Sequence, residues 1–364
     1  MEFPYNTTDK ELIRISKKAI NAERVSAEEA LYLFNNSPLG ALAYIADKIN
    51  HRINNKKVYY NKNFHIEPTN VCLFQCDFCS FSTTDTGKGW QKTHEEIIET
   101  VNEKYNVGAR ELHMTGGANP SFNLEYYTVL FKKLRNLFPD IHIKAFTAVE
   151  IDYLSKLESK NHKEVLSILK DAGLNSMPGG GAEIFNTEVR RIICKRKTSG
   201  EKWLEIHETA HKMGIPSNAT MLYGHIENIS HRIEHLELLR NLQDKTEGFN
   251  AFIPLKFRNK NNKLSHITET TLIDDIRTFA ISRIFLDNFK HIKAYWPMLG
   301  KENARLMLHF GVDDLDGTIQ DTTKIYSMAG SNESNPELTE DELRNLISNA
   351  GFKPIERDSL YNIL

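Results

Sequence analysis

Three cysteines within eight residues are the part of this sequence best suited to chemistry. Cys72, Cys76 and Cys79 form a C-x3-C-x2-C pattern, and Cys194 is the fourth cysteine of the 364 residues. Soft thiolates bind zinc, copper(I) or iron-sulfur clusters. A structural zinc site is closed by a fourth protein ligand, which the local spacing does not supply. Three thiolates on a four-iron cluster would leave one iron open to a small molecule, so the pattern favours a reactive cluster over a zinc site.

The composition indicates the class of protein that carries these thiols. Hydrophobic residues make up 40% of the chain and charged residues 26%, which is typical of a globular protein with a sizeable core. The 46 basic residues nearly balance the 48 acidic ones, so no overall field attracts nucleic acid or an anionic membrane. The sequence begins without a signal-peptide pattern and has no run of about 18 apolar residues. We therefore expect a cytoplasmic protein that acts on small molecules.

Strand and helix patterns alternate from residue 63 onward, as in βαβ units. Eight strands, each followed by a helical pattern, predict a (β/α)8 TIM-type barrel, with a doubly wound open sheet as the alternative. Barrel active sites lie at the carboxyl ends of the strands, and the thiols directly follow the first of them. The expected strands are Phe64–Val71, Glu111–Thr115, His142–Thr147, Leu174–Met177, Ser217–Tyr223, Asn250–Leu255, Ile292–Trp296 and Leu306–Gly311.

The chain is expected to contain three segments. Residues 1–60 read as an N-terminal helical segment packed on the barrel, residues 61–320 as the barrel, and residues 321–364 as a C-terminal extension with its own helix near 340–350. Ser26 and Glu29 have the spacing of a capping box within the first segment. The helices of the barrel are predicted near 94–106, 124–137, 150–172, 201–213, 231–244 and 268–288.

Two glycine-containing turns follow predicted strands. Thr115-Gly116-Gly117 ends the second strand, and Pro178-Gly-Gly-Gly-Ala-Glu183 follows the fourth. Glycine in such positions allows another group to approach the backbone closely. The nucleotide-binding patterns G-x-G-x-x-G and G-x4-G-K-[ST] are absent. The turns therefore favour a ligand that is not bound through a nucleotide phosphate-binding loop.

The thiol pattern, with Phe78 just before the third cysteine, resembles the radical S-adenosylmethionine (SAM) superfamily. Longer strings, such as His65–Asn70 and Ser217–His225, are similar to the aminofutalosine synthases of menaquinone biosynthesis over about residues 60 to 260. The resemblance implies that the three thiolates hold a 4Fe-4S cluster and that SAM binds its open iron and is consumed as co-substrate. Ala118 replaces an acidic residue of the superfamily motif. The positions that match cofactor-binding residues are Phe78, Thr115, Gly116, Gly117, Gly180, Glu183 and Arg190.

The resemblance also implies a reaction. A 5′-deoxyadenosyl radical adds to 3-[(1-carboxyvinyl)oxy]benzoate, which gives 6-amino-6-deoxyfutalosine with loss of CO2 or bicarbonate and release of methionine. An electron donor such as flavodoxin or ferredoxin would reduce the cluster. Two alternatives stay open: dehypoxanthine futalosine cyclase or a related hydrogen-abstracting radical SAM enzyme, and, in another class, a zinc-stabilised binding protein without catalytic activity.

Polar residues at predicted strand ends are the candidates for handling the second substrate. Glu67 and His225 are the predicted catalytic residues, because a carboxylate or an imidazole can move a proton near the ring. Cys194 is not predicted to be a ligand. The further candidates for contact with the substrate carboxylates or ring are Asn70, His113, Glu150, Lys256, Arg258 and Asp313.

Overall fold

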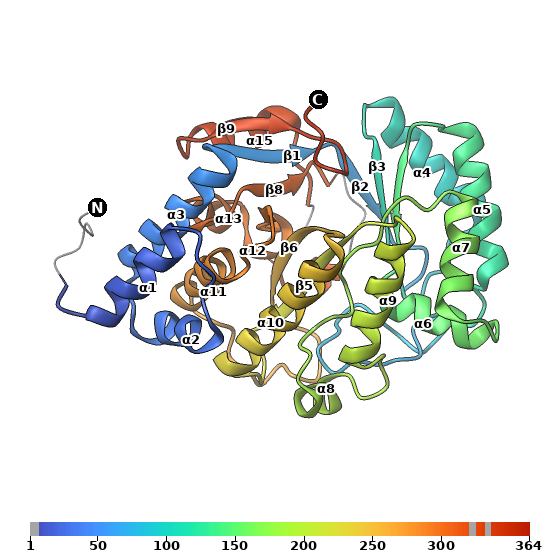
Figure 1. The fold of residues 1–364 in the computed structure, drawn as a ribbon. Helices are drawn as coiled ribbons and strands as arrows, with labels where there is room; N and C mark the ends of the chain where they lie inside the picture. The colour runs from blue at the N-terminus through green and yellow to red at the C-terminus, as the bar shows by residue number, and fades with distance from the viewer. Residues whose placement is uncertain (1–6, 320–324, 332–335) are drawn as a thin grey trace.

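Short parallel strands form the centre of the molecule, with helices around them (Figure 1). The computed structural model describes residues 7–319, 325–331 and 336–364. The expected boundary between barrel and extension, at residues 320 and 321, falls outside this part. The strands are β1 (Lys57–Asn61), β2 (Asn63–Ile66), β3 (Glu111–Met114), β4 (His142–Ala145), β5 (Ser217–Tyr223), β6 (Phe249–Lys256), β7 (His291–Ile292), β8 (Asp314–Gly317) and β9 (Lys353–Glu356).

The strands follow one another around a TIM-type barrel. Two parallel sheets, β2-β3-β4 and β5-β6-β7, are linked by single bridges from Lys144 to Ser176 and from Met177 to Ser217. Another bridge joins Lys293, just after β7, to Asp314 of β8. Between β8 and β2 the described contacts include side-chain hydrogen bonds, such as Thr318 Oγ1 to the Asn63 carbonyl at 2.9 Å. The predicted barrel class is confirmed.

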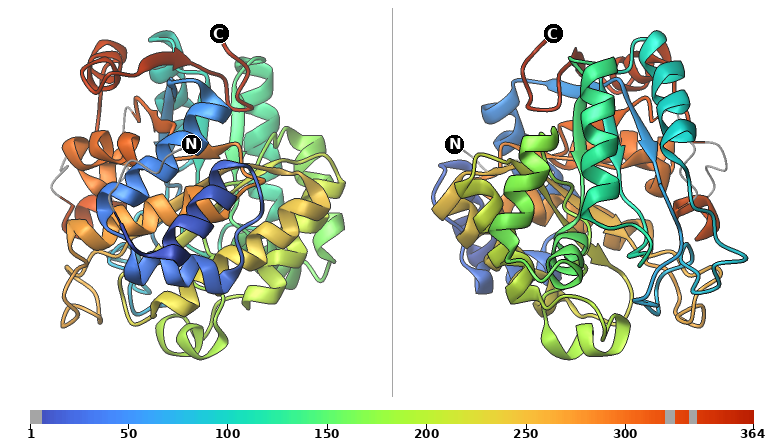
Figure 2. Two further views of the ribbon diagram at one scale, coloured as in Figure 1. Left: turned by 60° about the vertical axis from the view of Figure 1, so that its left-hand side comes forward. Right: turned by 90° about the vertical axis from the view of Figure 1, so that its right-hand side faces the viewer.

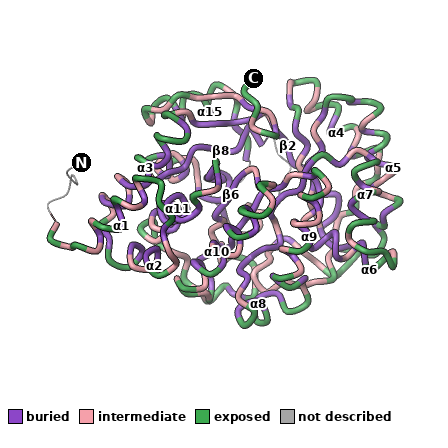
Figure 3. The backbone as a smooth tube through the Cα atoms, in the orientation of Figure 1, coloured by how far each residue is buried: buried purple, intermediate pink, exposed green. Residues whose placement is uncertain are grey.

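The helices cover the outside of this barrel, and their inner faces are apolar. Figure 3 shows buried backbone along the strands and exposed positions on the outer sides of the helices. The helices are α1 (Lys10–Ile20), α2 (Ala27–Asn36), α3 (Leu39–Asn54), α4 (His94–Asn106), α5 (Leu124–Leu137), α6 (Ala148–Leu157), α7 (His162–Ala172), α8 (Thr187–Ile193), α9 (Gly200–Lys212), α10 (Ile229–Thr246), α11 (Leu272–Phe285), α12 (Trp296–Leu299), α13 (Lys301–Met307), α14 (Ile325–Met328) and α15 (Glu340–Ser348). None of these helices is both long and apolar enough to cross a membrane.

The first and last strands of the chain pair with each other on one edge of the barrel. Strand β1 pairs in parallel with β8 on one side and with β9 on the other, so the segment before residue 61 contributes a strand as well as helices. Helix α2, which the Ser26 and Glu29 capping box begins as predicted, packs on α10 and α11. Figures 1 and 2 show the N-terminal helices on the outside of the barrel, with α2 beside α10 and α11. They leave the carboxyl ends of β2 to β4 uncovered.

The structure corrects several predicted elements. Residues Leu306–Gly311, the predicted eighth strand, lie in α13 and a 3-10 turn, and the eighth strand is β8 instead. The predicted strand at Ile292–Trp296 is only the two-residue β7, because α12 begins at Trp296. The single helix expected over 150–172 is divided into α6 and α7, since Asn161 begins a new helix with its own capping box. Residues 174–177 contribute isolated bridges rather than a strand.

Candidate active site

The three thiols lie on a long loop, residues 67–92, which we call the thiol loop. Asn70 holds this loop closed: its side chain donates to the Phe81 carbonyl at 3.2 Å and accepts from the Trp90 amide at 2.9 Å. Two backbone hydrogen bonds add to this brace, because the Cys72 amide donates to the Thr83 carbonyl and the Thr83 amide donates to the Asn70 carbonyl. All three cysteines are free and partly exposed. Asn70, a predicted substrate contact, is thus placed where it positions the thiols.

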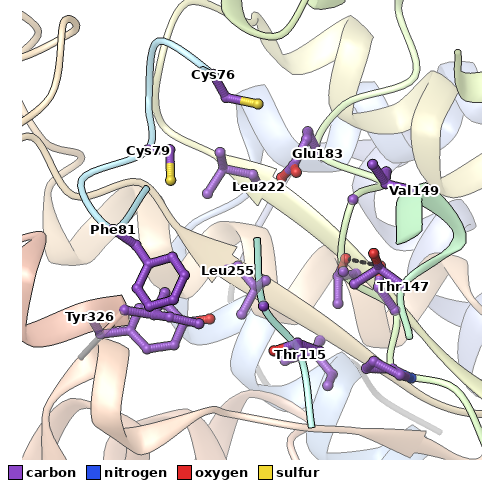
Figure 4. A pocket seen from close by; sticks show the side chains of 18 of the residues that line it. Cys76, Cys79, Phe81, Thr115, Thr147, Val149, Glu183, Leu222, Leu255 and Tyr326 are labelled. Carbon is purple, nitrogen blue, oxygen red and sulfur yellow. Dashed lines mark hydrogen bonds between the residues drawn. The ribbon is translucent and has the colours of Figure 1, made fainter. Parts of the chain in front are cut away.

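The thiol loop opens into a cavity within the barrel. Figure 4 shows Cys76 and Cys79 at one end of this cavity and Thr115 at the other. Among the described residues, no three His, Cys, Asp or Glu side chains converge as ligands of a single metal ion. A four-iron cluster binds each thiolate through a different iron, so the thiols need to surround a volume rather than a point. Free thiols around one mouth of a cavity fit such a cluster.

Lys197 provides a positive charge beside the thiols. Burial raises the pKa of the Cys76 thiol to about 12, and the nearby ammonium of Lys197 opposes that shift. The same ammonium lies 5.3 Å from the centre of the Phe78 ring and pairs with Glu183. Metal binding requires the thiolate form. Lys197, which lines the cavity, therefore favours the charge state in which Cys76 can act as a ligand.

The glycine turn after β3 fits tightly beneath the thiol loop. A Cβ atom on Gly117 would lie 2.1 Å from the Val71 carbonyl oxygen and 3.0 Å from the Cys72 Cβ atom. The Gly117 amide donates to the Thr69 carbonyl at 2.9 Å. The sequence predicted that another group approaches this glycine closely, and here that group is the Val71–Cys72 backbone of the thiol loop. Thr115, Gly116 and Gly117 all line the cavity.

Replacing Gly117 with alanine is expected to displace the thiol loop. The clash with Val71 is with backbone, which cannot rotate away, so a stability loss of about 1–3 kcal/mol is expected together with reduced iron content after reconstitution. Gly87→Ala is the control, because Gly87 lies in the same loop and its nearest contact is the Asp85 side chain at 3.3 Å. Equal iron content in the two variants would contradict this prediction.

The second glycine turn brings Glu183 to the cavity. A Cβ atom on Gly179 would lie 2.7 Å from backbone atoms of the neighbouring β5, and Glu183 itself has a φ of +50°, a left-handed conformation that is costly for this residue. Arg190 donates to the carbonyls of Gly181, Ala182, Ile184 and Thr198. Arg190 is absent from the cavity wall, so the structure places it as the support of this turn. Gly180 and Glu183 line the cavity.

Glu150 links the two turns. It accepts from the Gly116 amide at 3.2 Å and from the amide and hydroxyl of Thr147 at 2.8 Å, within the capping box of α6. Burial raises the pKa of this carboxyl to about 7, although the hydrogen bonds from Thr147 and Gly116 oppose the shift. Glu150 lines the cavity, and it holds the glycine turn of β3 against α6.

The raised pKa of Glu150 predicts a pH dependence of stability. Between pH 4.5 and about 7 the folded state keeps a proton that an unfolded glutamate has lost. The stability from this group is therefore fully present below pH 4.5 and is lost as the pH rises to 7, by roughly 3 kcal/mol. Buried histidines with lowered pKa values, such as His142 and His207, gain stability over the same range, so the effect is measured as a difference: from pH 4.5 to 7 the wild type should lose about 3 kcal/mol relative to Glu150→Gln. Glu164→Gln, in the exposed capping box of α7, should behave as the wild type; a parallel response of both variants would refute the assignment.

Deeper in the cavity the barrel carries polar side chains, which we call the charged layer. His65, His113 and Lys144 are register partners across β2, β3 and β4, so their side chains point to the same face. Lys144 pairs with Glu111 at 2.8 Å, and Lys293 pairs with Asp316 at 3.1 Å. The layer consists of the cavity-lining residues His65, Glu111, His113, Lys144, Lys293 and Asp316.

The structure does not bring the two predicted catalytic residues to the cavity wall. His225 is buried behind it; its Nε2 atom contacts the Leu222 carbonyl at 3.1 Å, and its Nδ1 atom contacts the Ile226 amide at 2.7 Å. Glu67 is also buried outside the wall, next to the Trp90 indole, which donates to its carbonyl at 3.0 Å. The catalytic role of both residues stays a prediction.

The basic candidates after β6 do reach the cavity, but the protein already engages them. Lys256 contacts the Asp275 carboxylate and the Thr270 carbonyl, each at 2.8 Å. Arg258 pairs with Glu269 at 2.8 Å and donates to the Met298 carbonyl. Asp313, the last substrate candidate, does not line the cavity. Because β8 begins at Asp314, Asp313 precedes its strand instead of following it, and it lies at the end opposite to the thiols.

Several cavity residues were missed from the sequence. Lys144 and Lys293 lie within predicted strands, each between apolar residues, and that isolated polar position could have indicated an inward-facing charge. Lys197 is part of a basic run that carries no such signal. Asp316 lies within β8, a strand that was not predicted. Tyr326 comes from α14, which the sequence did not indicate, and Figure 4 shows its ring beside Phe81 at the cavity wall.

Comparison with known proteins agrees with this site. The family model for the radical SAM superfamily matches residues 66–239, and the model for the CofH/MqnC C-terminal region matches residues 246–364. Aminodeoxyfutalosine synthase of Thermus thermophilus is 44% identical over 97% of this chain and 96% of its own length. Cyclic dehypoxanthine futalosine synthase of Streptomyces coelicolor is 37% identical over 98% and 90%. Methylornithine synthase has the same fold, with a TM-score of 0.72 at 16% identity over 93% and 97%.

The barrel, the thiol loop and these matches define a radical SAM enzyme, a class that uses a 4Fe-4S cluster and SAM. Within that class, the chain belongs to the family of the aminodeoxyfutalosine synthases and their CofH/MqnC relatives. This membership replaces the alternative of a zinc-stabilised binding protein without catalytic activity.

Proposed function

We propose that this enzyme is an aminodeoxyfutalosine synthase of menaquinone biosynthesis. It adds the 5′-deoxyadenosyl group of SAM to 3-[(1-carboxyvinyl)oxy]benzoate and forms 6-amino-6-deoxyfutalosine, with loss of CO2 or bicarbonate and release of methionine. The observation that carries the proposal is a single cavity that starts at the thiols, passes both glycine turns and continues into the barrel. It offers a place for a second substrate beyond SAM.

The residues at the mouth of the cavity have separate tasks in this proposal. Cys72, Cys76 and Cys79 hold the 4Fe-4S cluster, which with SAM supplies the deoxyadenosyl radical. Thr115 and the following glycines offer backbone groups to the methionine part of SAM. Glu183, whose carboxylate pairs with Lys197 and whose backbone has a φ of +50°, accepts hydrogen bonds from the ribose.

The electron for the cluster comes, in this proposal, from a small carrier such as flavodoxin or ferredoxin in the cytoplasm. Reducing conditions there keep the four cysteines free. The segment around the end of α8 lies next to the thiol loop, since the Asp77 amide donates to the carbonyl of Ile193, the last residue of α8. Its exposed basic residues, which suit an acidic carrier, are Arg191, Lys195 and Arg196.

Product analysis tests this function against the cyclase alternative, because a cyclase is also among the relatives, at 37% identity. The reconstituted enzyme is incubated without oxygen with SAM, a reductant and the enol ether. The synthase gives a product that retains the adenosyl group, together with methionine. Free 5′-deoxyadenosine without an adenosyl adduct would overturn the proposal and favour a hydrogen-abstracting relative.

A further inference from the structure

The charged layer is unusual for the inside of a barrel, where branched apolar side chains normally pack. Lys144 and Glu111 have side chains only 5% and 3% exposed, and Lys293 is 3% exposed. Taking such ion pairs out of water costs several kcal/mol per ion. Apolar residues of similar size would often serve stability as well or better. The layer is therefore better explained by a ligand than by folding.

Hydrogen-bonding groups in the layer are left unused by the protein. The Nε2 atom of His113 is buried without a hydrogen-bond partner among the described residues and can donate to a carboxylate; the Oε2 atom of Glu111 is also unpartnered, but it is an acceptor and does not bind one. An ammonium has three donors. Lys144 has one carboxylate partner, at 2.8 Å, and Lys293 has two, Asp316 at 3.1 Å and Asp314 at 3.9 Å. Donors therefore remain on both lysines for a ligand in the cavity.

The backbone also directs one member of the layer toward the cavity. Strand β8 has a bulge opposite β1, between the partners of Tyr59 and Asn61. Asp316 lies in this bulge with a φ of +69°, which costs free energy for a residue other than glycine. Bulges that redirect a side chain are common next to active sites. The carboxylate of Asp316, in turn, holds the ammonium of Lys293.

We infer that the charged layer recognises the ring carboxylate of the aromatic substrate, with Lys144 and Lys293 as the hydrogen-bond donors. This inference rests on the proposed function. The thiols follow β2, whereas the layer lies within the strands, so a substrate whose double bond meets the adenosyl group directs its far end to the layer. That far end is the ring with its carboxylate. Glu111 and Asp316 each pair with one of these two lysines.

Binding of small aromatic acids tests the layer without turnover. The probes are 3-methoxybenzoate and its neutral amide, measured by calorimetry on the reconstituted enzyme. The paired variant Lys144→Met with Glu111→Gln removes both charges of one ion pair and leaves no buried charge unpaired. It should bind the benzoate roughly 10- to 100-fold more weakly, the value of a charge-assisted hydrogen bond, and the amide about as the wild type does. Lys293→Met with Asp316→Asn is the second variant, because asparagine tolerates the left-handed backbone.

The outcomes separate the layer from the proposed function. A folded variant that binds both probes like the wild type, or that loses both equally, would overturn the carboxylate site. A wild type that binds the benzoate selectively and makes no adenosylated product from the enol ether would leave the layer as a carboxylate site and refute the synthase activity. If the enol ether is converted, the analogue without the ring carboxylate should show a raised KM in the wild type and no further rise in the variants.

Discussion

Replacing Cys76 with alanine is expected to abolish adenosyl transfer while leaving the barrel folded. Cys76 is one of three thiols that share one loop outside the strands, so its removal takes a ligand from the cluster and little from the core. Losing a residue that merely supports a metal ligand costs about 10- to 100-fold in affinity or activity, and losing the ligand itself should cost more. Iron and sulfide content, visible absorption and product formation after reconstitution measure the effect.

Cys194→Ala is the matched control for this prediction. Cys194 is buried at the end of α8, and it does not line the cavity. The variant should keep the iron, sulfide and product yield of the wild type, with only the modest stability loss of a small buried side chain. Loss of the cluster in Cys194→Ala, or unfolding of Cys76→Ala, would contradict the assignment and indicate a metal with a structural role.

The cluster end of the site could be predicted from the sequence because its parts are local. The three cysteines lie within eight residues, and each glycine turn is a continuous string. Such patterns keep their meaning even where strand boundaries are misplaced. The helices that cover the barrel were predicted for a similar reason, since capping boxes and helical periodicity are local signals.

The substrate end is assembled from single residues on separate strands, so no string of sequence carries it. His65, His113 and Lys144 become neighbours only through the register of β2, β3 and β4. Each stands alone between apolar residues, as in Phe64-His65-Ile66, and the signal appears only when the three strands are compared. Predicting residues after strand ends instead led to His225, which the structure buries behind the wall.

The eighth strand was misplaced because its residues do not resemble a strand. The apolar stretch near Leu306 suits a strand or a helix, and periodicity cannot separate the two over so short a run. The true strand, Asp314–Gly317, contains two aspartates, which are normally depleted in strands. Its charges are tolerated because Arg357 pairs with Asp314 at 2.7 Å and Lys293 pairs with Asp316. These partners are far away in the chain, so the sequence could not indicate them.

The same error made Asp313 a substrate candidate. The structure instead predicts that replacing Asp313 causes a large loss of stability. Its side chain is fully buried, where it accepts hydrogen bonds from Arg283 and from the Ile292 amide at 2.8 Å and contacts His291. Removing one partner of a buried ion pair leaves the other charge uncompensated. Asp313→Ala should therefore lower the free energy of unfolding by about 3–5 kcal/mol.

Glu302→Ala is the control for this loss, because Glu302 forms an exposed ion pair with Arg305 that is worth about 1 kcal/mol or less. Urea denaturation of both variants measures stability, and kcat/KM of the folded fraction measures activity. Asp313→Ala should keep the kcat/KM of the wild type, because its carboxylate lies at the end of β8 opposite to the thiols. A variant of unchanged stability with a raised KM for the enol ether would place Asp313 in the substrate site. If Asp313→Ala loses stability and its KM is unchanged, as we expect, then Asp313 stabilises the connection between β7 and β8.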